Sequence, residues 1–323
     1  TTGFNNVGVG RTALQNHTTG NHNTAVGRSA LAANTTASNN TAVGKSALGS
    51  NTTGTENVAA GTDALLSNVS GSYNTAVGYQ ALNTNTASFN TAIGRNALQD
   101  NINAQELVAV GDSCLANNTT ANKNTGCGRS AGFANTTGLE NAFFGYVAGS
   151  GNTTGGSNTF VGSQAGSGVT TGSENVVVGR GSVSHSNSTT GAANTVVGCD
   201  AVQGSAFTGS SNTIIGRQAA YSMTSGSNNS CLGAGSGNSS SPSGNIGTGS
   251  NTICLGDNNI TALFCADTSI SSSDERDKAD ITDFKIGLEW INALRPVTYK
   301  WDKRTWYGTD AEPYGTPDGS KKK

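Results

Sequence analysis

The chain has 323 residues, a formal net charge of −2 and only 12% charged residues. It contains neither a basic stripe nor a long acidic tail, which excludes a nucleic-acid-binding surface of the usual kind. The sequence also has no apolar run of about 18 residues or more, so it predicts no membrane insertion. Because it begins with Thr1, we expect it to be part of a longer gene product.

A short phrase, Asn-Thr-Ala-Val-Gly or a variant of it, recurs about every 17 residues from the N-terminus to beyond residue 250. A fixed period of this length is typical of a solenoid, whose units stack because none can bury its apolar face alone. The sequence therefore predicts an all-β fold over residues 1–256, a parallel β-solenoid (β-roll) of about fifteen 17-residue coils. The closing glycines of the coils are Gly10, Gly27, Gly44, Gly61, Gly78, Gly94, Gly111, Gly128, Gly145, Gly162, Gly179, Gly198, Gly216, Gly233 and Gly256.

The two residues before each repeat glycine are apolar or small in every coil, as Ala42 and Val43 are before Gly44. Successive strand residues face opposite sides, so both faces of this strand need cover. One face can fill the coil. The residue two before the glycine changes from Ala in early coils to Phe143 and Phe160 later. We predict that this growing face lines a three-fold axis, and a flattened monomeric solenoid with two interior layers is the alternative.

A second apolar pair follows three and four residues after the glycine. It is Ala47-Leu48 in an early coil and becomes Ala131-Gly132 in the eighth. The change to Gly coincides with the enlargement just described, so volume lost at one position is regained at another, as close packing requires. The pattern predicts two short strands per coil, joined by turns.

Polar and sulfur-containing residues of the repeat favour structural roles. Asn stands four residues before the glycine in thirteen of the fifteen coils, where stacked amides can hydrogen-bond along the axis. Cys127, Cys231 and Cys254 replace apolar residues beside the glycine, so we interpret them as small buried side chains. With no Cys-x-x-Cys spacing and only three His, the sequence predicts no metal site and no cofactor.

The repeat resembles the head of YadA-like trimeric adhesins, a parallel β-roll built on an Asn-Ser-Val-Ala-Ile-Gly phrase in somewhat shorter coils. The likeness covers about residues 5–256. It implies a homotrimer with a fibrous role at a surface. With neighbouring strands about 4.8 Å apart, fifteen such coils would form a rod on the order of 70 Å long.

The chemistry of the chain changes at Ser273, because the last 51 residues hold 20 of the 38 charged residues and all three Trp. Residues 285–295 place apolar side chains along one helical face, and residues 297–301 alternate as in a strand. We therefore expect a second domain over residues 273–323, after a neck or linker at residues 257–272.

This C-terminal part closely resembles the start of the endosialidase-type intramolecular chaperone. The likeness rests on Ser-Asp-Glu-Arg-Asp-Lys at residues 273–278 and Leu-Arg-Pro-Val-Thr-Tyr-Lys-Trp at residues 294–301. In that family the domain directs trimerisation of phage tail spikes and fibres and is then released by self-cleavage. The resemblance assigns the nucleophile to Ser273, the activating base to Lys278 and the scissile bond to Ser272-Ser273. The chain ends before the rest of that domain, so we expect only its N-terminal part.

A Ser/Lys pair is chemically reasonable, because a lysine can take the hydroxyl proton once desolvation lowers its pKa. An ordinary helix cap at Ser273 and a surface lysine at Lys278 are the alternative. Autoproteolysis is the only enzymatic activity that we expect.

The leading hypothesis is a structural virion protein, a trimeric phage tail fibre or spike that is made in the host cytoplasm and takes part in host attachment. Its expected partners are two further copies of the chain, other tail proteins and a host receptor or glycan. A bacterial trimeric adhesin head is one alternative. A polysaccharide-degrading spike is another, but only 18 charged residues precede Ser273, too few to favour paired catalytic carboxylates. Receptor contacts are expected on the inserted loops between Gly179 and Gly256.

Overall fold

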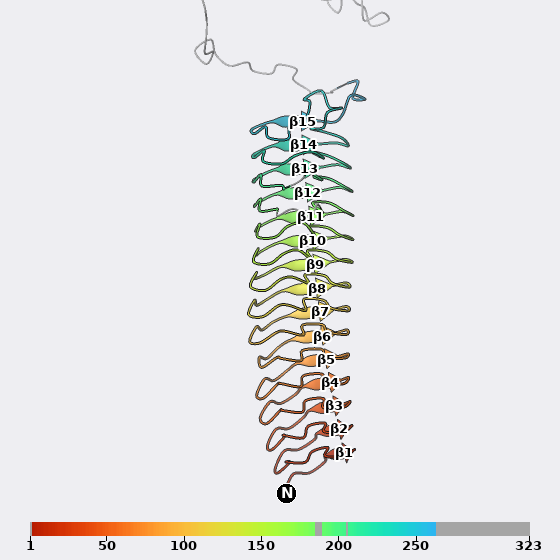
Figure 1. The fold of residues 1–323 in the computed structure, drawn as a ribbon, viewed down its shortest axis with the longest axis vertical. Coiled ribbons are helices and arrows are strands. Elements are labelled where there is room, and N and C mark those ends of the chain that lie inside the picture. The colour runs from red at the N-terminus through yellow and green to blue at the C-terminus, as the bar shows by residue number, and fades with distance from the viewer. Residues whose placement is uncertain (1, 185–188, 205, 263–323) are drawn as a thin grey trace, which may run out of the picture. The chain divides into compact units, whose positions relative to one another are not determined.

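The computed structural model describes residues 2–184, 189–204 and 206–262. These residues form fifteen three-residue strands, one per coil, and no helix. All fifteen belong to one parallel sheet in sequential order, so each strand pairs with the strand of the next coil (Figure 1). The strands are β1 (Val7–Val9), β2 (Thr24–Val26), β3 (Thr41–Val43), β4 (Val58–Ala60), β5 (Thr75–Val77), β6 (Thr91–Ile93), β7 (Val108–Val110), β8 (Thr125–Cys127), β9 (Ala142–Phe144), β10 (Thr159–Val161), β11 (Val176–Val178), β12 (Thr195–Val197), β13 (Thr213–Ile215), β14 (Ser230–Leu232) and β15 (Ile253–Leu255).

The predicted parallel β-solenoid is therefore confirmed, and equivalent residues of successive repeats pair with each other. Ala42 of β3 pairs with Ala59 of β4, its equivalent in the next coil. The longest spacing between repeat glycines, from Gly233 to Gly256, does not change this register, because Ser230 of β14 pairs with Ile253 of β15. The extra residues at 234–250 lie outside the sheet. The helix expected at residues 285–295 lies outside the described residues, and the domain boundaries stay predictions.

Each coil has one strand, not two, which corrects the prediction for the second apolar pair. Residues 45–50 form turns, and Ser46 and Leu48 have φ values of 57° and 50°. Left-handed residues at alternate positions cannot extend into a strand. The segment still joins the coils, because the Leu48 amide donates to the Ala64 carbonyl of the next coil, 3.0 Å away.

The side chains two before the repeat glycine fill the inside of the coil. The prediction that this face lines a three-fold axis is wrong, because Ala42, Phe143 and Phe160 are completely buried within the single chain. They meet the residue four after the glycine, which comes from the opposite wall. A Cβ built on Gly166 would lie 2.5 Å from Cδ2 of Phe160, so the bulky ring occupies the space that Leu48 fills in its coil.

The repeat glycine is required by the distance between coils. Gly44 has a φ of 136°, and a Cβ added to it would lie 2.5 Å from the Gly61 carbonyl oxygen in the next coil. Only a residue without a side chain permits this approach. Each coil therefore needs one glycine at the point where its backbone touches the backbone of the next coil, and this requirement explains why glycine recurs once per repeat.

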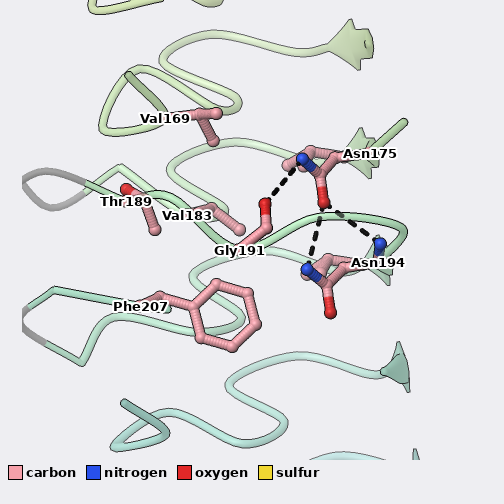
Figure 2. Close-up of a pocket in the computed structure, with 9 residues that line it drawn as sticks. Val169, Asn175, Val183, Thr189, Gly191, Asn194 and Phe207 are labelled. Carbon is pink, nitrogen blue, oxygen red and sulfur yellow. Dashed lines mark hydrogen bonds between the residues drawn. The ribbon is translucent and has the colours of Figure 1, made fainter. Parts of the chain in front are cut away.

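Buried asparagines form a column at the corner before the strand, as predicted. The Asn175 side-chain amide donates to the Gly191 carbonyl at 2.9 Å, and its Oδ1 accepts from both the backbone and side-chain nitrogens of Asn194, each at 3.0 Å (Figure 2). A second column lies at the Asn-Thr-Thr-Gly corner, where the Asn51 amide donates to the Gly54 carbonyl at 2.9 Å. These bonds satisfy the buried amide donors. In the second column, some side-chain oxygens are buried without a hydrogen-bond partner among the described residues, namely those of Asn34, Asn68, Asn101 and Asn152.

Candidate interaction surface and cleavage site

The predicted cleavage residues Ser272, Ser273 and Lys278 lie outside the described residues, so their geometry stays a prediction. Within residues 2–184, 189–204 and 206–262, no three His, Cys, Asp or Glu side chains gather in a way that could hold a metal ion. The same residues include no helix long and apolar enough to cross a membrane. The candidate site described below is an extended surface on the solenoid.

The outward face of the sheet consists of the residues one and three before each repeat glycine. It is the opposite face from the one we expected to be left open. In the central coils, Val43, Ile93 and Phe144 are 43%, 41% and 41% exposed. The full set of exposed large apolar residues one before the glycine is Val9, Val43, Val77, Ile93, Phe144, Val161, Ile215, Leu232 and Leu255.

The cysteines divide between the two faces. Cys127 lies on the outward face and is exposed, which corrects the prediction that it is buried, whereas Cys231 and Cys254 are buried as predicted. Burial raises the pKa of the Cys114 thiol to about 12 and that of Cys231 also to about 12. Both thiols stay protonated at neutral pH and are poor nucleophiles.

Charged residues border one edge of the outward face at the position directly after the glycine, which we call the post-glycine column. Arg95 pairs with Asp112 of the next coil at 2.7 Å, and Arg129 approaches the same carboxylate at 3.6 Å. The hydrogen bond from Arg95 is the main cause that lowers the pKa of Asp112. Arg129 also lies over the Tyr146 ring, 5.7 Å from its centre.

The opposite edge is bordered by the residues five before the glycine, which we call the corner column. All have positive φ, such as 60° at Lys123 and 57° at Glu140, and these two form an ion pair at 3.6 Å. Tyr73 and Phe89 of neighbouring coils stack with their ring centres 5.1 Å apart. Both columns therefore make contacts between successive coils.

Two concave sites in the described coils were candidates for binding a small molecule or a glycan. A cavity between Val169, Val183 and Phe207 has a volume of about 10 Å³, room for roughly one water molecule (Figure 2). Glu140 and Glu174 line an open surface hollow, but Glu140 is paired with Lys123. An exposed carboxylate that is already paired with a lysine is not positioned as the acid of glycoside hydrolysis.

Sequence comparison supplies the remaining observation. Residues 273–317 match the family model of the chaperone of endosialidase. The match begins at Ser273, the residue predicted to be the nucleophile. No curated protein and no solved structure matches the chain. A β-solenoid followed by the start of this chaperone domain fits a phage tail fibre.

Proposed function

We propose that the chain is part of the shaft of a trimeric phage tail fibre or spike that helps to attach the particle to its host. The observation that carries this proposal is the order of the two parts, a stacked parallel solenoid followed by the endosialidase chaperone match at residues 273–317. The elongated solenoid would be the part of the chain whose assembly this chaperone domain assists.

The architecture suits a shaft because every coil repeats the same contacts. Fifteen strands spaced by about 4.8 Å give a rod on the order of 70 Å long. Contacts to the host are assigned to the inserted loops between Gly179 and Gly256, a part of the chain where Tyr221 and Asn238 line an open surface hollow. Loops on a rigid scaffold are the usual place for such binding residues.

Self-cleavage is the second part of the proposal. The Ser273 hydroxyl would attack the Ser272 carbonyl carbon while Lys278 takes the hydroxyl proton. The peptide C–N bond then breaks, the freed amine of Ser273 gains a proton, and an ester joins the two residues. Water hydrolyses this ester, which yields a Ser272 carboxylate and restores the Ser273 hydroxyl.

The test compares the full chain with S273A and K278A variants by intact mass. We expect the unmodified chain to lose residues 273–323 and both variants to keep them. S272A is the matched control, because it changes a neighbouring serine but leaves the nucleophile and the base in place. An unmodified chain that keeps its full mass during assembly would refute self-cleavage. Sedimentation of the same samples should give a trimer, and a monomer would refute the trimeric shaft.

A further inference from the structure

We propose that a second copy of this chain, running parallel to the first, covers the outward face, with its corner column one coil out of step with the post-glycine column beside it. The inference rests on the proposed trimer and names its contact surface. It reverses the expectation from the sequence, because the face toward the partner is the one that carries Val43 and Phe144.

The first argument is the lack of cover on a parallel sheet. Parallel sheets occur almost entirely with both faces buried. Here the inner face is filled by Ala42, Phe143 and their equivalents, whereas Val43 and Phe144 on the other face stay exposed. The exposed apolar residues repeat along the sheet, a continuous arrangement that marks an association surface rather than scattered surface residues.

The second argument is charge, and it identifies the partner as another copy of this chain. The post-glycine column reads positive, negative, positive over three successive coils, while the corner column reads negative, positive, negative, starting one coil later. Ion pairs along each column explain each pattern by itself, but they do not explain why the two are opposite and displaced. The six residues are Arg95, Asp112 and Arg129 in the first column and Glu106, Lys123 and Glu140 in the second.

A displacement of one coil brings only opposite charges together. It creates four pairs between copies: Lys45 with Glu56, Arg95 with Glu106, Asp112 with Lys123, and Arg129 with Glu140. Contact between the same coils would instead oppose Glu106 to Asp112 and Lys123 to Arg129, which are like charges. Complementary charges of this kind fix the register of two surfaces more than they strengthen the contact.

The geometry of the coils allows this displacement. One coil is a step of about 4.8 Å, and the ion pair between Arg95 and Asp112 already spans such a step within the chain. Rotation about an axis parallel to the rod keeps equivalent coils of the copies level, so the displacement is one of side-chain pairing and not of the chains along the rod. This rotation brings the post-glycine column of one copy to the corner column of the next, and repeated contacts of this kind close into a ring. An antiparallel pair would place each column against itself.

Engineered disulfides test both the surface and the displacement. In a chain with Cys127→Val, Cys199→Ser and Cys265→Ser, we add K45C with E56C, which lie one coil apart. The matched control is K45C with H22C, which pairs position 45 with the corner residue of the preceding coil. Mild oxidation should link the first variant into a reducible trimer on a denaturing gel, and the control should stay unlinked.

Three outcomes contradict the proposal. A linked trimer from the control alone would refute the one-coil displacement. A linked dimer with no trimer would refute the closed ring of three. If neither variant links although the unmodified chain sediments as a trimer, the surface is wrong while the proposed function stands. A monomeric unmodified chain would refute both.

Carbodiimide cross-linking tests the same pairing in the unmodified chain, so the result does not depend on whether a variant folds. It should couple Lys45 to Glu56, and mass spectrometry of the covalent oligomer should recover that linked peptide. An oligomer that contains other links but lacks this one would contradict the displacement.

Discussion

At the scale of the residue, the repeat glycine and the buried asparagine have different tasks. Gly44 permits the backbones of two coils to touch, since no Cβ fits beside the Gly61 carbonyl. Asn57 then saturates the corner that this contact buries, donating to Gly71 at 2.8 Å and accepting from the Asn74 backbone at 3.0 Å. The glycine that permits close stacking and the asparagine that hydrogen-bonds the buried backbone are thus four residues apart in each repeat.

Replacement of Gly44 by alanine should lower the free energy of unfolding by roughly 2–4 kcal/mol, because the residue has a φ of 136° and its new Cβ meets backbone. Gly244→Ala is the control, since Gly244 also has positive φ, 67°, but has open space around it. We expect that change to cost about 1 kcal/mol. Urea unfolding at matched chain concentration measures both, and equal losses would contradict the role of coil contact.

At the scale of the element, the two walls of each coil share one interior volume. Ala42 faces Leu48 in an early coil, whereas Phe160 faces Gly166 in a later one. The two Phe rings also pack against each other along the axis, tilted by 40°, with the centres of Phe143 and Phe160 5.6 Å apart. The core thus changes its composition along the rod without a change in coil size.

A double-mutant cycle on Phe160 and Gly166 tests this sharing. Phe160→Ala alone should destabilise by about 3–5 kcal/mol through the cavity it leaves, and Gly166→Leu alone should destabilise through overlap with the ring. The double variant restores the Ala/Leu combination of the early coils. It should lose at least about 1 kcal/mol less than the sum of the single changes. Additive losses in urea unfolding would show that the two positions do not share space.

The sequence predicts the stacking, the coil number and the asparagine column, because periodic glycine and amide positions have one geometric interpretation. It does not reveal which face of the strand is inside, since Ala42 and Val43 are both apolar. The reciprocal sizes at Phe160 and Gly166 were the usable signal, because only side chains in one interior exchange volume. The turn at Leu48 was missed because its positive φ is unusual for a bulky residue.

At the scale of the whole molecule, the solenoid is a series of nearly equivalent units whose contacts are with their neighbours. The ladder from β1 to β15 keeps its register across intervals of different length, so the loops absorb every insertion. The charged columns follow the same period. Removal of one complete unit therefore preserves both the stacking and the relation between the columns that remain.

Deletion of residues 45–61, one complete coil, should leave a folded rod that is shorter by one strand spacing. Gly44 would then be followed by Thr62, and Asn74 would stack on Asn40. Deletion of residues 45–52 is the control, because it removes about half a coil and displaces the following strand. Far-UV circular dichroism and the cooperativity of thermal unfolding measure the outcome, and similar unfolding of the two variants would contradict the modular description.

The direction of the ladder has a mechanical consequence. Hydrogen bonds between parallel strands run along the rod, so tension on the two ends pulls every coil junction apart along its bonds. Junctions in series yield at the weakest one, and their strengths do not add. Leu107 interrupts the asparagine column, and with it the side-chain oxygen that other coils offer to the next backbone amide. The junction of β7 and β8 thus lacks a hydrogen bond that neighbouring junctions have, and we expect it to resist tension less than they do.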